Sequence, residues 1–241
     1  MKKHIPNILT LLNLLCGSIA VLFAVNSNFI SAALFVFLGI FFDFFDGFAA
    51  RKLEVQSELG LQLDSLADMV TSGLVPGIVM FKLLELVVSD WGVVNLSSGY
   101  HLPFVPAFGL IITLASAYRL AKFNVDNEQQ TFFKGLPTPA NALFILSLPL
   151  ILEFQNNDLI NSIILNRWFL IGVAILSAYL LNSNIKLFAL KFKDYGFKGN
   201  STRYIFLLLC AVLLIVLKFA AIPVIIVLYI LMSVLDNSIS K

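Results

Sequence analysis

Charged residues are scarce in this sequence. Only 12% of the 241 residues are Asp, Glu, Lys or Arg, whereas 59% are hydrophobic. A soluble globular domain carries about a quarter charged and about half apolar residues. This composition therefore excludes a soluble domain, and the high apolar content also excludes an intrinsically disordered chain.

Cysteine and histidine are also nearly absent, with two of each. Cys16 and Cys210 both lie inside apolar runs, so the chain is not a disulfide-stabilised scaffold. Neither residue type lies near the acidic residues described below, which argues against a zinc site built on sulfur or imidazole ligands.

Long apolar runs are abundant instead. Runs of about 17 to 25 apolar residues are typical of membrane helices, because only a helix satisfies its own backbone hydrogen bonds in hydrocarbon. We predict an all-α polytopic membrane bundle, formed by one domain over residues 1–241. About eight spans are expected: 5–25, 29–50, 61–84, 104–124, 138–154, 167–184, 204–219 and 221–235. A turn between the last two is predicted at Lys218 and Pro223.

The distribution of basic residues predicts the orientation. With the N-terminus inside, cytoplasmic segments hold 13 of the 16 Lys and Arg residues, as the positive-inside rule requires. Both termini are then cytoplasmic. A cleaved signal peptide is the alternative for the first run, although Pro6, Asn7, Thr10 and Asn13 are unusual in one. Without an organellar targeting segment, we expect a prokaryotic inner membrane.

Four aspartates interrupt the apolar runs. Asp43 and Asp46 are three residues apart at the end of the second run, and Asp64 and Asp68 are four apart at the start of the third. Each pair shares one helix face, and the short connection brings the two helices back antiparallel. An aspartate within a membrane helix costs about 2.5 to 3.5 kcal/mol on insertion scales and is usually functional. We therefore expect one carboxylate cluster at the cytoplasmic face.

An all-carboxylate cluster suits Mg²⁺, Mn²⁺ or Ca²⁺, and four carboxylates suit two ions. Arg51 is a candidate counter-charge, but one arginine does not balance four carboxylates. Gly47 and Gly60 flank the aspartates. Small residues there permit either a close approach of a ligand to the backbone or tight helix packing.

The pattern over residues 43–68 resembles the signature of the CDP-alcohol phosphotransferase family. Every fixed position and spacing is present in Asp43-x2-Asp46-Gly47-x2-Ala50-Arg51-x8-Gly60-x3-Asp64-x3-Asp68. Members are integral membrane enzymes that transfer a phosphatidyl or similar group from a CDP-linked donor to an alcohol and release CMP.

The resemblance implies roles for individual residues. The four aspartates would bind Mg²⁺ or Mn²⁺, with Asp68 also the catalytic base. It also implies a homodimer. CDP would be bound by Asn7, Thr10, Gly47, Ala50, Arg51 and Ser57. Asn7 and Thr10 could instead only cap the first helix.

Three further stretches, 5–17, 115–124 and 133–142, resemble the phosphatidylserine synthases of this family. They imply CDP-diacylglycerol as donor and L-serine as acceptor, with the acceptor bound in the region 115–142. The basic side chains could bind the carboxylate, or could simply extend to the membrane surface, and the Gly-Leu-Pro-Thr-Pro run could be a plain turn. The candidate serine-binding residues are Arg119, Lys122, Asn124, Gly135, Pro137 and Asn141.

Two alternatives remain. Glycerol 3-phosphate or an inositol phosphate could be the acceptor, although a phosphorylated acceptor would favour several arginines near the site. A cation transporter would also carry carboxylates in its helices, usually near the bilayer midplane and on repeated elements, and we find no repeat. No feature predicts a nucleic-acid partner.

Overall fold

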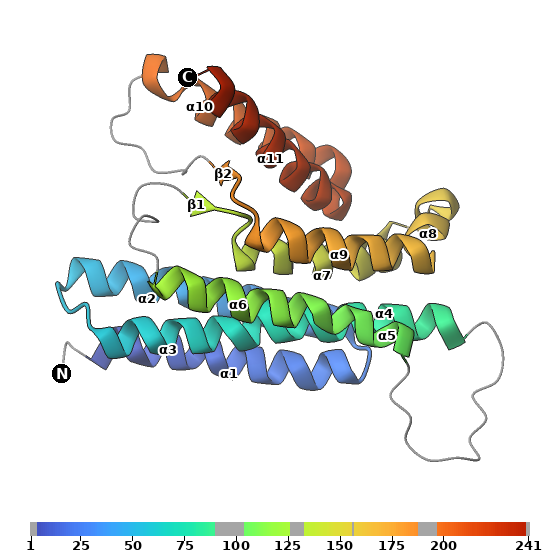
Figure 1. Cartoon of the computed structure of the whole chain (residues 1–241), viewed down its shortest axis with the longest axis horizontal. Coiled ribbons are helices and arrows are strands. Elements are labelled where there is room, and N and C mark those ends of the chain that lie inside the picture. The colour runs from blue at the N-terminus through green and yellow to red at the C-terminus, as the bar shows by residue number, and fades with distance from the viewer. Residues whose placement is uncertain (1–3, 90–103, 126–132, 156, 188–196, 240–241) are drawn as a thin grey trace.

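The computed structural model describes residues 4–89, 104–125, 133–155, 157–187 and 197–239 (Figure 1). The described chain is mostly helical, which confirms the predicted class. Its strands, β1 (Phe133–Lys134) and β2 (Lys186–Leu187), form one short antiparallel pair.

The helices follow one another as hairpins. The first four long segments are α1 (Ile5–Val25), α2 (Phe29–Lys52), the continuous series α3 (Glu58–Asp68), η2 (Met69–Leu74) and α4 (Val75–Ser89), and the series α5 (Phe104–Ala107), η3 (Phe108–Leu110) and α6 (Ile111–Val125). The remaining elements are α7 (Thr138–Phe154), α8 (Asp158–Ile164), α9 (Arg167–Asn182), α10 (Phe197–Leu217), η5 (Lys218–Ala220) and α11 (Ala221–Ile239).

Among the described residues, five helices are long and apolar enough to cross a membrane, or up to six if α8 and α9, bent by 62°, form one span. The helix α7 is apolar but shorter. The apolar stretch Arg203–Leu235 is counted as one of the five, and Lys218 interrupts it with a left-handed φ of 49°. The predicted membrane helices are thus confirmed as a class, while the number eight stays a prediction.

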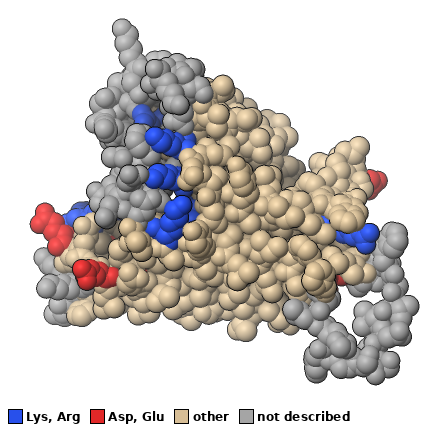
Figure 2. Space-filling view, in the orientation of Figure 1, with Lys and Arg blue, Asp and Glu red and all other residues tan. Residues whose placement is uncertain are grey.

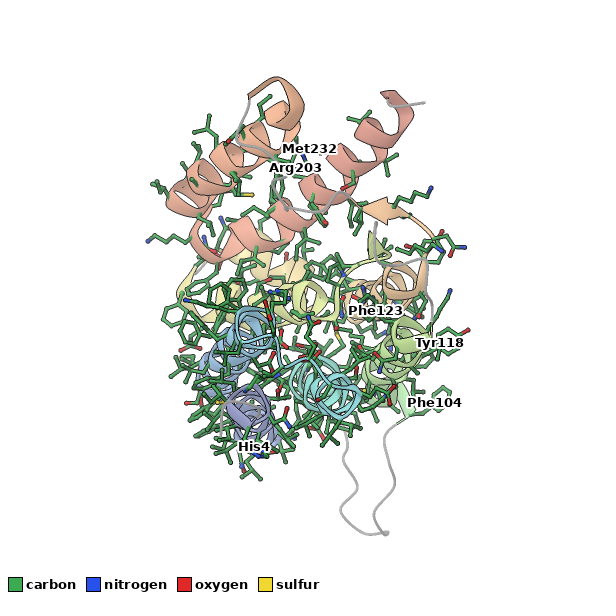
Figure 3. All side chains as sticks on the ribbon, turned by 90° about the vertical axis from the view of Figure 1, so that its left-hand side faces the viewer. His4, Phe104, Tyr118, Phe123, Arg203 and Met232 are labelled. Atoms are coloured by element: carbon green, nitrogen blue, oxygen red, sulfur yellow. The ribbon has the colours of Figure 1, made fainter. Side chains whose placement is uncertain are left out.

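The helices pack in layers (Figure 1). The segments α1 to α6 form one layer, α7 and α9 lie on it, and α10 with α11 lies on the other side of α7 and α9, where α11 packs on α7 (Figures 1 and 3). The main core is aliphatic, with fully buried side chains such as Val36, Met80, Ile145 and Leu170. On the face shown in Figure 2, charged side chains lie at the two ends, with an uncharged band between them, as a membrane requires.

Polar residues at the helix termini determine the turns. The side chain of Asn28 accepts a hydrogen bond from Ser31 N, and that of Ser57 accepts one from Gly60 N, so that α2 and α3 begin at caps. The Asn28 cap ends the turn between α1 and α2, and the Ser57 cap limits the reversal between α2 and α3 to a few residues. The N-terminus, this reversal and the β1–β2 pair all lie at one end of the molecule (Figure 1).

Glycines allow neighbouring helices to approach closely, and Gly109 lies against the backbone of a neighbouring helix. A Cβ at Gly109 would press on the backbone of Met80 and Phe81 in α4, whereas a Cβ at Gly172 would meet nothing within 4 Å. We expect Gly109→Ala to destabilise the protein by about 1–3 kcal/mol, because α4 would have to move. The measurement is the thermal unfolding temperature in detergent.

Gly172→Ala is the matched control. Alanine is a better helix former than glycine by about 1 kcal/mol, so this variant should unfold at or slightly above the wild-type temperature. Equal unfolding temperatures for the two variants would contradict the close packing of η3 on α4.

Candidate functional site

Three of the four aspartates converge as the sequence predicted. Asp43 and Asp46 of α2 and Asp64 of α3 each offer a carboxylate oxygen, and these oxygens lie within 4.8 Å of one another. Asp46 is buried, and the other two are half-buried. The antiparallel return of α3 along α2 creates this convergence.

Asp68 lies one turn further along α3, as its last residue, and does not belong to that group of three. Its Oδ1 accepts a hydrogen bond from Asn13 Nδ2 at 3.2 Å. The charge of Arg119 on α6 also acts on Asp68. The charges of Asp43, Asp46 and Asp64 also interact with that of Asp68, so the fourth carboxylate belongs to the same electrostatic cluster, with Asn13 and Arg119 as additional neighbours.

The first helix contributes a hydroxyl to the cluster. Thr10 Oγ1 donates a hydrogen bond to Asp46 Oδ2 at 2.5 Å, and Thr10 is only 3% exposed. This contact shows that Thr10 does more than shape the start of α1.

A cavity of about 460 Å³ opens beside Asp46 and Asp64. The end of α2, the start of α3 and the first turns of α1 form its walls. All six residues predicted to bind CDP line it: Asn7, Thr10, Gly47, Ala50, Arg51 and Ser57. The sequence pattern thus identified one continuous surface.

Small residues keep this cavity open. At Gly47, a Cβ would lie 3.4 Å from Arg51 Nη1, so the guanidinium extends across this glycine. At Gly60, a Cβ would lie 3.2 Å from Ser57 Oγ and 3.4 Å from Asn7 Oδ1. A larger side chain at either position would compete with the polar groups for space.

Sequence reasoning missed part of the lining. Pro6, Val55, Gln56, Glu58 and Leu61 also line the cavity. Most of them lie around the reversal between α2 and α3, where Glu54 adopts a positive φ of 54°. No motif marks these positions, because the turn conformation brings them to the cavity.

Outside the lining of this cavity, two buried polar residues have unused hydrogen-bonding atoms. Arg119 is 8% exposed, and its Nε has no hydrogen-bond partner among the described residues. Asn141 on α7 is fully buried, and in the described part of the chain neither atom of its amide has a partner. Since α7 contacts both α2 and η2, Asn141 belongs to the same region of the bundle.

The other predicted acceptor residues are placed differently. Lys122 is exposed and lines a separate shallow cavity of about 310 Å³ with Tyr118, which points outward from α6 (Figure 3). Asn124 Nδ2 donates to Ser65 Oγ at 2.9 Å and so connects α6 to α3.

Gly135 and Pro137 shape the chain between β1 and α7. Gly135 has a φ of 74°, and its N–H donates to Ile185 O at 2.9 Å. The next amide, of Leu136, donates to Leu180 O at 2.9 Å. Pro137 is the residue that precedes α7. The two amides before Pro137 are thus used within the fold.

The electrostatics of the cluster call for a cation. Arg51 acts on Asp46 and Arg119 acts on Asp68, but two arginines do not balance four carboxylates. Asp64 Oδ1 is buried without a hydrogen-bond partner among the described residues. An unused carboxylate oxygen in an all-oxygen donor set fits a divalent cation, so this cluster could hold a metal ion.

A divalent cation should therefore stabilise the protein. An ion at 100 times its dissociation constant contributes about 2.7 kcal/mol, which would raise the thermal unfolding temperature in detergent when Mg²⁺ or Mn²⁺ is added. Asp64→Asn should remove most of this increase, because it removes a charged ligand. Asp158→Asn, at the first turn of α8, should keep it. An unfolding temperature that neither ion changes in the wild-type protein would contradict the site.

Comparisons with known proteins agree with this geometry. Residues 3–181 match the sequence model of the CDP-alcohol phosphatidyltransferase family. A Bacillus subtilis (strain 168) protein named "CDP-diacylglycerol--serine O-phosphatidyltransferase" is 34% identical over 162 residues, which are 67% of this chain and 81% of that protein. A Methanocaldococcus jannaschii protein with the same name is 31% identical over 182 residues, 76% of this chain and 72% of that protein.

A third relative, the "Archaetidylserine synthase" of Methanothermobacter thermautotrophicus, is 28% identical over 146 residues, 59% of this chain and 56% of that protein. The region that matches the family model contains the four aspartates and the whole cavity. With more than half of its length matched in this way, the chain belongs to the CDP-alcohol phosphatidyltransferase family.

Proposed function

We propose that the protein transfers the phosphatidyl group of CDP-diacylglycerol to the hydroxyl of L-serine, which yields phosphatidylserine and CMP. One observation carries the proposal. The aspartate cluster borders a cavity that Arg51, Asp46 and Asp64 line, and the charge of the buried Arg119 acts on Asp68 of the same cluster. The names of the B. subtilis and M. jannaschii relatives support this choice of donor and acceptor.

The cavity would bind the donor. The planar fork of Arg51 can make two parallel hydrogen bonds to a phosphate, and Gly47 leaves room for the pyrophosphate beside it. Ser57 and Asn7 offer polar atoms for the nucleoside at the mouth of the cavity. The acyl chains would remain in the bilayer around the apolar surfaces of α1 and α2.

The aspartates would hold the metal. Asp43, Asp46, Asp64 and Asp68 provide enough oxygens for two Mg²⁺ or Mn²⁺ ions. When bound, such ions act as Lewis acids that stabilise negative charge on the pyrophosphate.

Asp68 would act as the base. It accepts the proton of the serine hydroxyl, whose oxygen then forms a bond to the phosphorus that carries diacylglycerol. The bond from that phosphorus to the oxygen bridging to CMP breaks, and CMP leaves with the electron pair. Arg51 stabilises the charge that develops on the departing phosphate.

Replacement of the base tests this mechanism. Asp68→Asn keeps the shape of the side chain but does not accept the proton, so serine-dependent CMP release should fall by about 100-fold or more. The assay uses purified protein, CDP-diacylglycerol, Mn²⁺ or Mg²⁺ and labelled serine. Near-wild-type turnover in this variant would exclude Asp68 as the base. The same assay with glycerol 3-phosphate and inositol phosphate tests the other acceptors.

We further propose that Arg119 binds the serine carboxylate and that Asn141 contacts its polar groups. Both residues are buried and have unused hydrogen-bonding atoms. A single arginine suits one carboxylate better than the larger charge of a phosphorylated acceptor. Lys122, Asn124, Gly135 and Pro137 would support the surrounding fold.

Separate substitutions of the two basic residues of α6 test this assignment. Arg119→Lys removes the fork and should raise the KM for serine by about tenfold, equivalent to about 1.4 kcal/mol, with little change in the KM for CDP-diacylglycerol. Lys122→Gln should have the smaller effect because its side chain is exposed. A larger increase for Lys122→Gln would reverse the assignment.

We also propose eight spans with both termini cytoplasmic, in a prokaryotic inner membrane, and a single domain that forms a homodimer. The cluster lies at the end that carries the N-terminus, where Lys and Arg side chains gather (Figure 2). Figure 1 shows α11 running back beside α10, so the break at Lys218 would be the turn between two spans.

Thiol labelling of intact cells tests the orientation. In a variant without Cys16 and Cys210, an impermeant reagent should label Asn26→Cys and Lys218→Cys but not Glu54→Cys. Labelling of Glu54→Cys alone would reverse the topology, and protection of Lys218→Cys would reject the last turn. Light scattering of the detergent-solubilised protein measures its oligomeric state, and a monomer mass would reject the dimer.

A further inference from the structure

Asn13 is a buried polar residue on the apolar helix α1, one turn beyond Thr10. Its side chain is fully buried, and Nδ2 donates to Asp68 Oδ1 at 3.2 Å. Its backbone oxygen accepts a hydrogen bond from Thr71 Oγ1 at 3.2 Å. Its Oδ1 has no hydrogen-bond partner among the described residues. Among the described residues, the side-chain amide therefore makes one hydrogen bond, and its acceptor is the proposed base.

The energetics argue against a purely structural role. A buried oxygen without a partner costs about 1–3 kcal/mol. Hydrogen bonds between membrane helices contribute only about 0.6 kcal/mol on average. A leucine at this position of an apolar helix would avoid the cost. Residues that break a local rule in this way are expected at functional sites.

Two glycines allow the neighbouring helices to pack closely around Asn13. At Gly39 of α2, a Cβ would lie 2.8 Å from Asn13 Oδ1. At Gly17 of α1, a Cβ would collide with Thr71 of η2. The absence of side chains at both positions lets the helices close around the amide, so its orientation is set by packing from α1, α2 and η2.

The segment after Asp68 contributes to the same arrangement. The π-helical η2 starts at Met69, directly after Asp68, and its Thr71 is the residue that binds the Asn13 carbonyl. A π-helical turn accommodates an extra residue and is found mostly at functional positions. Asp68 and Thr71 both bind α1 at Asn13, so this one residue joins α1 to the end of α3 and to η2.

We propose that Asn13 is a positioning residue which, by occupying Asp68 Oδ1, directs the other carboxylate oxygen of Asp68 toward the hydroxyl of the acceptor alcohol. The proposal rests on the proposed function. An amide N–H suits this task because it orients a carboxylate without transferring a proton to it. Asn13 itself does not touch the reacting atoms.

Two variants test the proposal. Asn13→Asp keeps the shape of the side chain but removes the N–H donor, and Asn13→Ala removes the whole side-chain amide. Mutation of residues that orient metal ligands typically lowers activity by about 10- to 100-fold. We expect a loss of the same order for a residue that orients the base. We expect kcat to fall by about this factor, while the KM values for CDP-diacylglycerol and serine stay within about twofold.

Asn182 on α9 is the matched control. Its Nδ2 donates to Ala115 O at 3.1 Å, and its Oδ1 likewise lacks a partner among the described residues. Its acceptor is a backbone oxygen rather than a carboxylate. Asn182→Asp and Asn182→Ala should lower the thermal unfolding temperature but leave kcat unchanged.

Gly39→Ala is a second approach that retains Asn13. Its methyl group would displace the amide, so kcat should fall in this variant too. Should an Asn13 variant fail to fold, Gly39→Ala decides the question, since wild-type kcat in that folded variant overturns the proposal.

Two other results overturn the proposal. One is a wild-type kcat in both Asn13 variants. The other is a fall in kcat in the Asn182 variants as large as that in the Asn13 variants, for the same loss of thermal stability. A wild-type protein that releases no CMP with serine would reject serine as the acceptor instead, and the Asn13 comparison then uses whichever alcohol supports CMP release.

Discussion

Mutual repulsion among carboxylates, placed where membrane helices end, is the constraint on which the rest of this structure depends. Two adjacent helices each bring two aspartates to one place, and neither helix has enough positive charge to balance them. Neutral hydrogen-bond donors from α1 and the charges of Arg51 and Arg119 reduce this repulsion. The carboxylate oxygens also suit a divalent cation. Helix α1 therefore belongs to the site, although it carries no aspartate.

The cluster also has two kinds of neighbour. Asp46 and Asp64 line a cavity of about 460 Å³, whereas Asp68 accepts a hydrogen bond from Asn13 of α1 and interacts with the charge of Arg119 on α6. The proposed transfer reaction would use both kinds of neighbour, because donor and acceptor approach the same phosphorus from opposite sides. Helix α3 carries both Asp64 and Asp68 and so links the two.

Much of the fold could be predicted from hydrophobicity alone. The helices α1 and α7 have the predicted bounds, because an apolar run in a membrane must be helical over its whole length. The short elements α5, α8 and η2 and the β1–β2 pair were not predicted. The strand pair depends on the pairing of Lys134 with the distant Lys186, and such a contact leaves no local pattern. The three helical elements are too short to give a distinct periodicity within or beside the apolar runs.

The sequence by itself determined the membrane class and the family signature, because these follow from local composition and residue spacing, and the resemblance to that family named six residues that line one cavity. The tertiary structure decided which residues are buried and which contact one another, because residue spacing does not determine either. Arg119 and Lys122 are one turn apart on α6, yet one is buried near Asp68 and the other is exposed. Likewise, only packing places Asn13 against Asp68, because a contact between residues 55 positions apart depends on how three helices close around it.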